Sequence, residues 1–218
     1  MRVVLATGNA GKLREFAAML GPAGFEFEPQ SAFGIDSPPE TGTTFFDNAL
    51  LKARHVATLT GLAAMADDSG LEVDALDGAP GVFSARYAGV GASDQANVQK
   101  LLEALHDVPL AQRTARFRCV IALLADPHAE PVFGVGSWSG RILLSPRGQG
   151  GFGYDPVFEP MTFESMTTGA ADFMGCSAAE LAPARKQAES HRALALQDLG
   201  RKLASLPIVG SEPVTRAE

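Results

Sequence analysis

The sequence predicts a mixed α/β fold, and three observations lead to that class. Apolar, β-branched runs alternate with stretches of helical periodicity over the first half of the chain. Two long strand-like segments, residues 114–124 and 132–144, then follow each other across a short turn, which is typical of an antiparallel hairpin. Hydrophobic residues make up 46% of the chain, enough for a substantial core. Because alternating strands and helices favour parallel pairing and the hairpin adds antiparallel pairing, we expect one mixed sheet.

The N-terminal elements follow from apolar runs and the residues that end them. Apolar side chains recur at helical spacing from Lys12 onwards, until Gly21-Pro22 ends that helix. A second helix is expected over residues 44–60, because Thr44 is a good N-cap and Asp47, three residues later, resembles the second half of a capping box. Strands are expected at residues 2–7, 25–27 and 62–66, the last of them ending at Asp67-Asp68-Ser69-Gly70.

The C-terminal half is expected to contain the hairpin, a glycine-rich loop and a long helical segment. Ser93 caps a helix, residues 145–156 form the loop, and residues 183–206 are mostly helical. The chain shows no internal repeat and no clear linker, so we expect one compact, two-lobed domain over residues 1–206. Residues 207–218 are polar and are expected to form a flexible tail.

Composition excludes several classes of function. The net charge of −7 argues against binding of a nucleic acid polymer, which requires a basic surface. No apolar run approaches the ~20 residues that span a bilayer, and the N-terminus does not resemble a signal peptide. The two cysteines, Cys119 and Cys176, form no CxxC pair, which favours reduced thiols and a cytoplasmic location.

A candidate phosphate-binding turn lies between the first strand and the first helix. The segment Thr7-Gly8-Asn9-Ala10-Gly11-Lys12 carries small residues that let backbone N–H groups approach a phosphate, and Lys12 adds a positive charge. It is not a Walker A loop, because Ala6 and Leu13 occupy positions where that motif needs glycine and a hydroxyl residue. An ordinary strand-to-helix turn would give the same pattern.

An acidic pair provides a candidate metal site. Asp67 and Asp68 follow an apolar run, and adjacent carboxylates repel each other unless a cation neutralises them. Mg²⁺ suits this arrangement, because it uses one or two carboxylates together with substrate phosphate oxygens. Side chains alternate along an extended segment, so one of the two is expected to face a ligand. An Asx turn before Gly70 explains the pair equally well, and Glu40 alone reads as a surface charge.

Two further segments carry groups suited to a nucleotide. Phe152, inside the glycine loop, could stack on a base, although a loop with a core phenylalanine has the same pattern. Lys186 and the pair His191-Arg192 offer cationic donors for phosphate or carbonyl oxygens, unless they form an exposed basic face. Lys186 and Ser190 would share a face of a continuous helix.

Together these segments resemble the inosine triphosphate pyrophosphatase family. The resemblance rests on residues 3–16 (VVLATGNAGKLREF), 40–53 (ETGTTFFDNALLKA), 66–89 (ADDSGLEVDALDGAPGVFSARYAG), 150–158 (GGFGYDPVF) and 179–196 (AELAPARKQAESHRALAL). It implies an elongated central sheet with two lobes around an active-site cleft, a homodimer and dependence on Mg²⁺. It also implies hydrolysis of noncanonical purine nucleoside triphosphates (ITP, dITP and XTP) to the monophosphate and pyrophosphate, which removes deaminated purines from the nucleotide pool.

The resemblance also implies roles for individual residues. Asp68 matches the proton acceptor and, with Glu40, a metal ligand. We expect Asp68 to activate a water for attack on the α-phosphorus, while Lys52 helps to hold the triphosphate. The positions that match substrate-binding residues are Thr7, Gly8, Asn9, Ala10, Gly11, Lys12, Ser69, Phe152, Gly153, Tyr154, Asp155, Lys186, His191 and Arg192. Two alternatives stay open: a nucleotide-binding regulator without activity, and a pyrophosphatase that acts on pyrimidine nucleotides.

Overall fold

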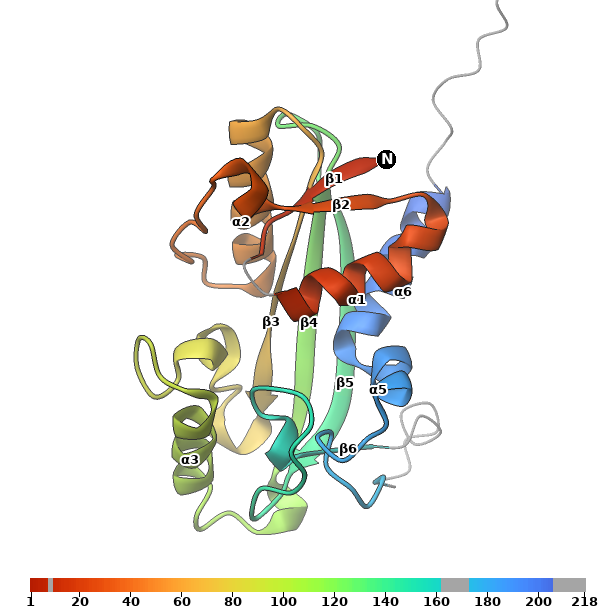
Figure 1. The fold of residues 1–218 in the computed structure, drawn as a ribbon. Helices are drawn as coiled ribbons and strands as arrows, with labels where there is room; N and C mark the ends of the chain where they lie inside the picture. Colours follow the sequence, from red (N-terminus) through yellow and green to blue (C-terminus); the bar gives the residue numbers. More distant parts are fainter. Residues whose placement is uncertain (8–9, 162–172, 206–218) are drawn as a thin grey trace, which may run out of the picture.

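A six-stranded mixed sheet forms the centre of the protein in the computed structural model, which describes residues 1–7, 10–161 and 173–205 (Figure 1). The strand order is β2-β1-β3-β4-β5-β6. β1 pairs in parallel with β2 and β3, and the remaining pairs are antiparallel, which confirms the predicted mixed sheet. The strands are β1 (Arg2–Leu5), β2 (Glu26–Pro29), β3 (Ala64–Val73), β4 (Thr114–Leu124), β5 (Val132–Ile142) and β6 (Phe158–Pro160).

The helices surround the long strands β3, β4 and β5, which run through the whole molecule (Figure 1). α2 lies with β1 and β2 toward one end, and α3 lies with β6 toward the other (Figure 1). The α-helices are α1 (Ala10–Leu20), α2 (Phe45–Thr60), α3 (Asp94–Ala104), α5 (Pro183–Glu189) and α6 (His191–Ser205). The 3-10 helices are η1 (Gly21–Ala23), η2 (Gln30–Phe33), η3 (Asp74–Leu76), η4 (Gly81–Arg86), η5 (Leu110–Gln112) and η6 (Asp155–Val157). Among these described helices, none is both long and apolar enough to cross a bilayer.

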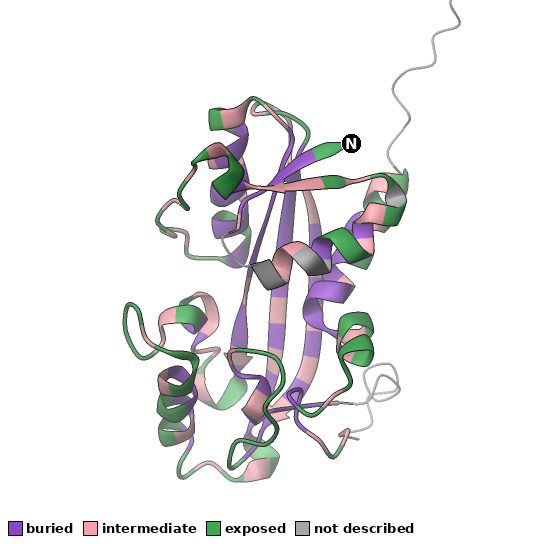
Figure 2. Cartoon of the chain, in the orientation of Figure 1, coloured by how far each residue is buried: buried purple, intermediate pink, exposed green. Residues whose placement is uncertain are grey.

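Apolar side chains are buried on both faces of the sheet. Much of the central strands is coloured as buried (Figure 2). One cluster joins α2 to β3 and β4 through residues such as Val56 and Val120. A second cluster packs α1 and α6 against the opposite face. α6 lies very close to β5 at Gly136. A Cβ at this position would clash with the carbonyl oxygen of His191, so the absence of a side chain permits the approach. The two helix layers therefore have fixed positions relative to β3, which passes between them.

Capping residues fix the helix starts as the sequence predicts. Thr44 caps α2, and its hydroxyl group accepts a hydrogen bond from the Asp47 amide at 3.1 Å while the Asp47 carboxylate accepts one from the Thr44 amide at 3.1 Å. Ser93 caps α3 through the Ala96 amide at 3.2 Å. Both caps satisfy backbone N–H groups that the first helical turn leaves without partners.

Two predicted elements differ from the structure. β3 does not end at Asp67 but continues to Val73, because β4 pairs with it from Ala64 to Val73 and this ladder outweighs the low strand propensity of aspartate and glycine. The C-terminal helix is not continuous. Ser190 is extended (φ −69°, ψ 159°), and its hydroxyl group accepts a hydrogen bond from the Ala193 amide at 3.3 Å, which begins α6. The predicted tail, residues 207–218, lies outside the described residues.

Candidate active site

Two adjacent carboxylates in the middle of β3 organise the site, and they face opposite sides of the sheet as strand alternation predicts. Asp67 faces α1 and α6: its Oδ2 lies 2.9 Å from Nζ of Lys12 and 3.4 Å from Nη2 of Arg192. Asp68 faces α2, where its Oδ1 lies 2.9 Å from Nζ of Lys52. One strand therefore supplies two separate ionic centres.

Asp67 is a buried carboxylate that is charged at neutral pH. Burial by itself raises the pKa of a carboxyl group, but the positive charges of Lys12, Arg192 and Lys52 outweigh it and hold the pKa of Asp67 well below its ordinary value. Asp67 thus ties the first turns of α1 and α6 to β3. The sequence patterns did not predict this role.

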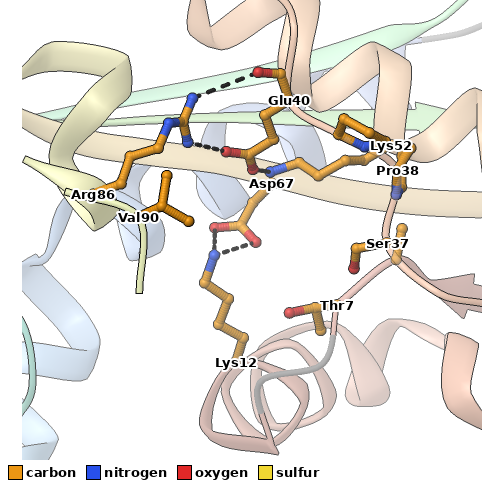
Figure 3. A pocket seen from close by; sticks show the side chains of 11 residues that line it. Thr7, Lys12, Ser37, Pro38, Glu40, Lys52, Asp67, Arg86 and Val90 are labelled. Carbon is orange, nitrogen blue, oxygen red and sulfur yellow. Dashed lines mark hydrogen bonds and ion pairs between the residues drawn. The ribbon is translucent and has the colours of Figure 1, made fainter. Parts of the chain in front are cut away.

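Lys52 joins the two carboxylates that the sequence proposes as metal ligands. Its Nζ donates to Oδ1 of Asp68 at 2.9 Å. The same Nζ donates to Oε1 of Glu40 at 2.7 Å (Figure 3). Nδ2 of Asn48, one turn earlier in α2, donates to Oδ2 of Asp68 at 3.3 Å. The helix therefore supplies two donors to Asp68 from one face.

The charges in this cluster shift the pKa values in different directions. Burial is the largest influence on Asp68, and together with the negative charge of Glu40 it raises the pKa of Asp68 despite Lys52. Burial also favours protonated Glu40, but Lys52 and Arg86 outweigh it and lower the pKa of that carboxyl group. Burial lowers the pKa of Lys52, yet the carboxylates of Asp68, Asp67 and Glu40 reverse this, so the ammonium group stays charged.

Two cavities meet at Thr7 and Lys12, which line both. The smaller has a volume of about 550 Å³ and a charged lining that includes Lys12, Glu40, Lys52, Asp67 and Arg86 (Figure 3). The larger has a volume of about 890 Å³. Its lining includes Ser69, Phe117, Phe152, Gly153, Tyr154, Asp155, Lys186, His191 and Arg192.

The larger cavity combines an exposed aromatic ring with buried cationic and neutral donors. Phe152 is 47% exposed, and Nζ of Lys186 lies 5.2 Å from the centre of its ring. His191 stacks on Phe117 with ring centres 4.8 Å apart. Burial, followed by the charges of Arg192 and Lys186, keeps the pKa of His191 well below 6.5, so its imidazole is neutral at neutral pH.

Comparison with known proteins shows which family has this sequence and fold. The model of the Ham1 family matches residues 3–202. This chain belongs to the Ham1 family. It is 52% identical to a dITP/XTP pyrophosphatase of Vibrio vulnificus over 209 residues, covering 95% of this chain and 99% of the relative. It is 54% identical to a dITP/XTP pyrophosphatase of Shigella flexneri over 199 residues, covering 90% and 94%.

Solved structures of Ham1 proteins have the same fold. A HAM1 protein from Coxiella burnetii matches with a TM-score of 0.83 and 44% identity, covering 94% of this chain and all (100%) of that one. The Staphylococcus aureus Ham1 protein matches with a TM-score of 0.79 and 36% identity, covering 94% and 98%. The resemblance stated from the motifs, and the mixed α/β class, are therefore confirmed.

The described part of this Ham1 chain brings most of the predicted site residues to the two cavities. Ala10 and Gly11 begin α1, whereas Gly8 and Asn9 lie outside the described residues. The larger cavity receives Ser69 from β3, residues 152–155 from the glycine loop, and Lys186, His191 and Arg192 from α5 and α6. Glu40 and Lys52 line the smaller cavity, whereas Asp68 lies behind Lys52 and lines neither. Lys186 forms an ion pair with Asp155, whose carboxylate also accepts a hydrogen bond from the Phe152 amide at 2.8 Å.

Tyr154 holds the loop in place from within. It is 4% exposed, and its hydroxyl group donates to the carbonyl oxygen of Ser84 in η4 at 2.9 Å. The neighbouring residue adds a second contact, because the Gly153 amide donates to Oδ2 of Asp94 at 2.7 Å. The glycine loop is thus joined to η4 and to α3, and both of these elements also line the larger cavity.

Two residues that bind the proposed metal ligands carry no role in the sequence patterns. Asn48 lies one turn before Lys52 in the same helix, and this spacing is the signal that both can reach one partner. Arg86 lies within residues 66–89, where no local pattern gives it a role. Nη1 of Arg86 donates to Oε2 of Glu40 at 2.9 Å, across 46 residues of sequence that no local pattern can bridge (Figure 3).

The acidic groups fit a divalent cation that completes its coordination with substrate oxygens. Within the described residues, no group of three or more histidine, cysteine or acidic side chains forms a metal site on its own. Glu40 and Asp68 nevertheless converge on one ammonium group, that of Lys52, so two carboxylates already share a single positive charge. This donor set matches the preference of Mg²⁺ for one or two carboxylates plus phosphate oxygens.

Proposed function

We propose that this protein hydrolyses the triphosphates of deaminated purine nucleosides, ITP, dITP and XTP, to the monophosphate and pyrophosphate. The observation that carries the proposal is the junction of the two cavities at Thr7 and Lys12. One cavity has the charges that a triphosphate needs, and the other has the aromatic ring and donors that a base needs. The names of the two curated relatives, dITP/XTP pyrophosphatase, support the same substrates.

Asp68 is the proposed proton acceptor for a water that attacks the α-phosphorus. Its raised pKa suits proton transfer near neutral pH better than that of an ordinary carboxylate. Lys52, Lys12 and the start of α1 would bind and orient the phosphate groups, which is the main task in phosphoryl transfer. Asp68 and Glu40 would hold Mg²⁺, which when bound neutralises charge on the phosphate oxygens.

Base selection would depend on the 6-position of the purine. Hypoxanthine and xanthine carry a carbonyl group there, which can accept hydrogen bonds from Arg192 and neighbouring N–H groups. Adenine carries an amino group, so a donor would face a donor, and such a mismatch can discriminate by ~10⁴-fold. Phe152, half exposed in the cavity, would stack on the purine.

The test is a substrate panel with identified products. With Mg²⁺ present, ITP, dITP and XTP should yield monophosphate and pyrophosphate, while ATP and pyrimidine triphosphates react far more slowly. Asp68→Asn should lower kcat by 10²-fold or more, in line with ~10²–10⁴-fold for general-base catalysis, and keep nucleotide affinity. Asp74→Asn, which alters an exposed carboxylate just after the same strand, is the matched control and should keep full activity.

Four results would contradict parts of this proposal. ATP turned over as fast as ITP would contradict the base selection, and release of orthophosphate would contradict attack at the α-phosphorus. Full activity of Asp68→Asn would remove the proposed proton acceptor. A protein that binds ITP without cleaving it would be the regulator considered above. The homodimer implied by the resemblance and the cytoplasmic location favoured by the two cysteines stay predictions.

A further inference from the structure

Arg86 brings a positive charge to the smaller cavity from η4, a segment that also contributes Ser84 and Ala85 to the larger cavity. It is the last residue of η4, and its side chain is 28% exposed. Nη1 donates to Oε2 of Glu40 at 2.9 Å, and Nη2 lies 3.5 Å from the Glu40 carbonyl oxygen (Figure 3). A guanidinium group has five N–H donors in a planar fork, more than Glu40 engages.

The backbone beneath Arg86 is held by contacts on several sides. Oγ of Ser84 accepts from the Leu71 amide of β3 at 2.9 Å, and the Ser84 carbonyl accepts from the Tyr154 hydroxyl group at 2.9 Å. Nδ2 of Asn97 in α3 donates to the Ala85 carbonyl at 3.3 Å. The guanidinium group also lies over the ring of Phe83, 5.3 Å from its centre. Arg86 is therefore a preorganised cation rather than a free surface arginine.

The two lysines of the smaller cavity already pair with buried carboxylates, so we expect Arg86 to bind an anionic ligand there. Lys12 is bound by Asp67, and Lys52 is bound by both Asp68 and Glu40, so these lysines already neutralise acidic groups. A triphosphate brings further negative charges that must be matched. Arg86 is paired with the most exposed of the three carboxylates, Glu40, whose side chain is 28% exposed, and it has the fork geometry that matches two phosphate oxygens.

We propose that Arg86 binds the pyrophosphate part of the substrate directly, exchanging Glu40 for phosphate oxygens when the cavity is filled. This inference rests on the proposed function and adds to it a contact for the leaving group. Arg86 comes from η4 and Lys12 from α1, so two cations from different elements of the cavity wall would hold the polyphosphate. Glu40 and the phosphate then compete for one guanidinium group.

The competition gives a test that requires no catalysis and no metal. Binding of inorganic pyrophosphate is measured by calorimetry in the presence of EDTA, for the full-length protein and three variants. Arg86→Gln should weaken binding at least tenfold, and Arg86→Lys should weaken it several-fold because it keeps the charge but loses the fork. Glu40→Gln should bind pyrophosphate as tightly as the wild type or more tightly, because it releases Arg86.

The controls separate direct binding from other roles. Binding of inosine monophosphate should stay within twofold in Arg86→Gln, since that ligand lacks the pyrophosphate. An equal loss for both ligands, or unchanged pyrophosphate affinity in Arg86→Gln, would overturn the proposal. A loss in Glu40→Gln as large as that in Arg86→Gln would also overturn it, by showing that Arg86 acts through Glu40. Arg86→Lys provides the same test if Arg86→Gln does not fold.

The proposed function can fail independently. Wild-type protein that does not convert ITP to inosine monophosphate and pyrophosphate would refute the enzyme, whereas the EDTA binding series would still decide the role of Arg86.

Discussion

Replacing Lys52 by methionine should lower the stability of the protein, because two carboxylates share its ammonium group. The methionine keeps most of the apolar stem and removes the charge. Oε1 of Glu40 and Oδ1 of Asp68, at 2.7 and 2.9 Å from Nζ, then lose their shared donor. Asn48 still donates to Asp68, and Arg86 still donates to Glu40, so neither carboxylate becomes fully isolated.

The structure sets the magnitude of this effect. Removing one partner of a fully buried ion pair costs roughly 3–5 kcal/mol. The side chains of Lys52 and Asp68 are 10% and 9% exposed, but that of Glu40 is 28% exposed, so we take about 3 kcal/mol. For a domain of this size each kcal/mol shifts Tm by about 2–4 °C, which predicts a drop of about 6–12 °C in EDTA.

Thermal unfolding with and without Mg²⁺ provides the assay. Excess Mg²⁺ should raise the Tm of Lys52→Met more than that of the wild type, because a bound cation replaces the missing charge. Lys100→Met is the matched control. Lys100 is an exposed lysine whose Nζ donates to the Tyr87 carbonyl, and its loss should cost less than about 1 kcal/mol. A Tm for Lys52→Met close to that of the wild type in EDTA would refute the reasoning.

Two further predictions concern His191 and Gly70. Because the folded state keeps His191 neutral while the unfolded chain binds a proton below about pH 6.5, stability contributed by this group is present above that pH and is lost as the pH falls. Denaturation with urea at about pH 7 and pH 5.5 should show a pH-dependent loss that is roughly 1 kcal/mol smaller in His191→Gln, and equal losses would contradict the buried neutral state. Gly70→Ala would place a Cβ 2.6 Å from Oγ of Ser84 and against the Gly81 carbonyl, so η4 must move. We expect a loss of about 2 kcal/mol in urea denaturation together with weaker pyrophosphate binding, and unchanged stability would show that η4 yields easily.

Much of the fold could be predicted because its signals are local. The capping box at Thr44, the cap at Ser93 and the hairpin of β4 and β5 each depend on residues a few positions apart. The length of β3 could not be predicted in this way. Asp67 to Gly70 read as a turn, and it is the ladder with β4, more than 40 residues later, that keeps them extended.

In the candidate site, too, the residues with a local sequence pattern could be predicted and those that depend on distant contacts could not. Asp68 and Lys12 were identified because each lies in a segment with a recognisable pattern. Arg86 and the charge network of Asp67 depend on contacts between elements far apart in sequence, such as the 3.4 Å approach of Arg192 to Asp67. The spacing of Lys186 and Ser190 assumes a continuous helix, and Ser190 interrupts that helix although both residues line the larger cavity.

Asp67 and Asp68 are adjacent residues of a strand that is paired along its length. This position should make β3 intolerant of insertions and deletions. Loss or gain of one codon within β3, upstream of the pair, would turn every later side chain of the strand to the other face. Asp67 would then point at α2, and Asp68 would point at the layer of α1 and α6. β4 pairs with β3 from Ala64 to Val73, so a shift of register that restored the two carboxylates would displace β4 relative to β3 along the whole ladder. Insertions and deletions should therefore accumulate in the connecting loops and be rare within β3.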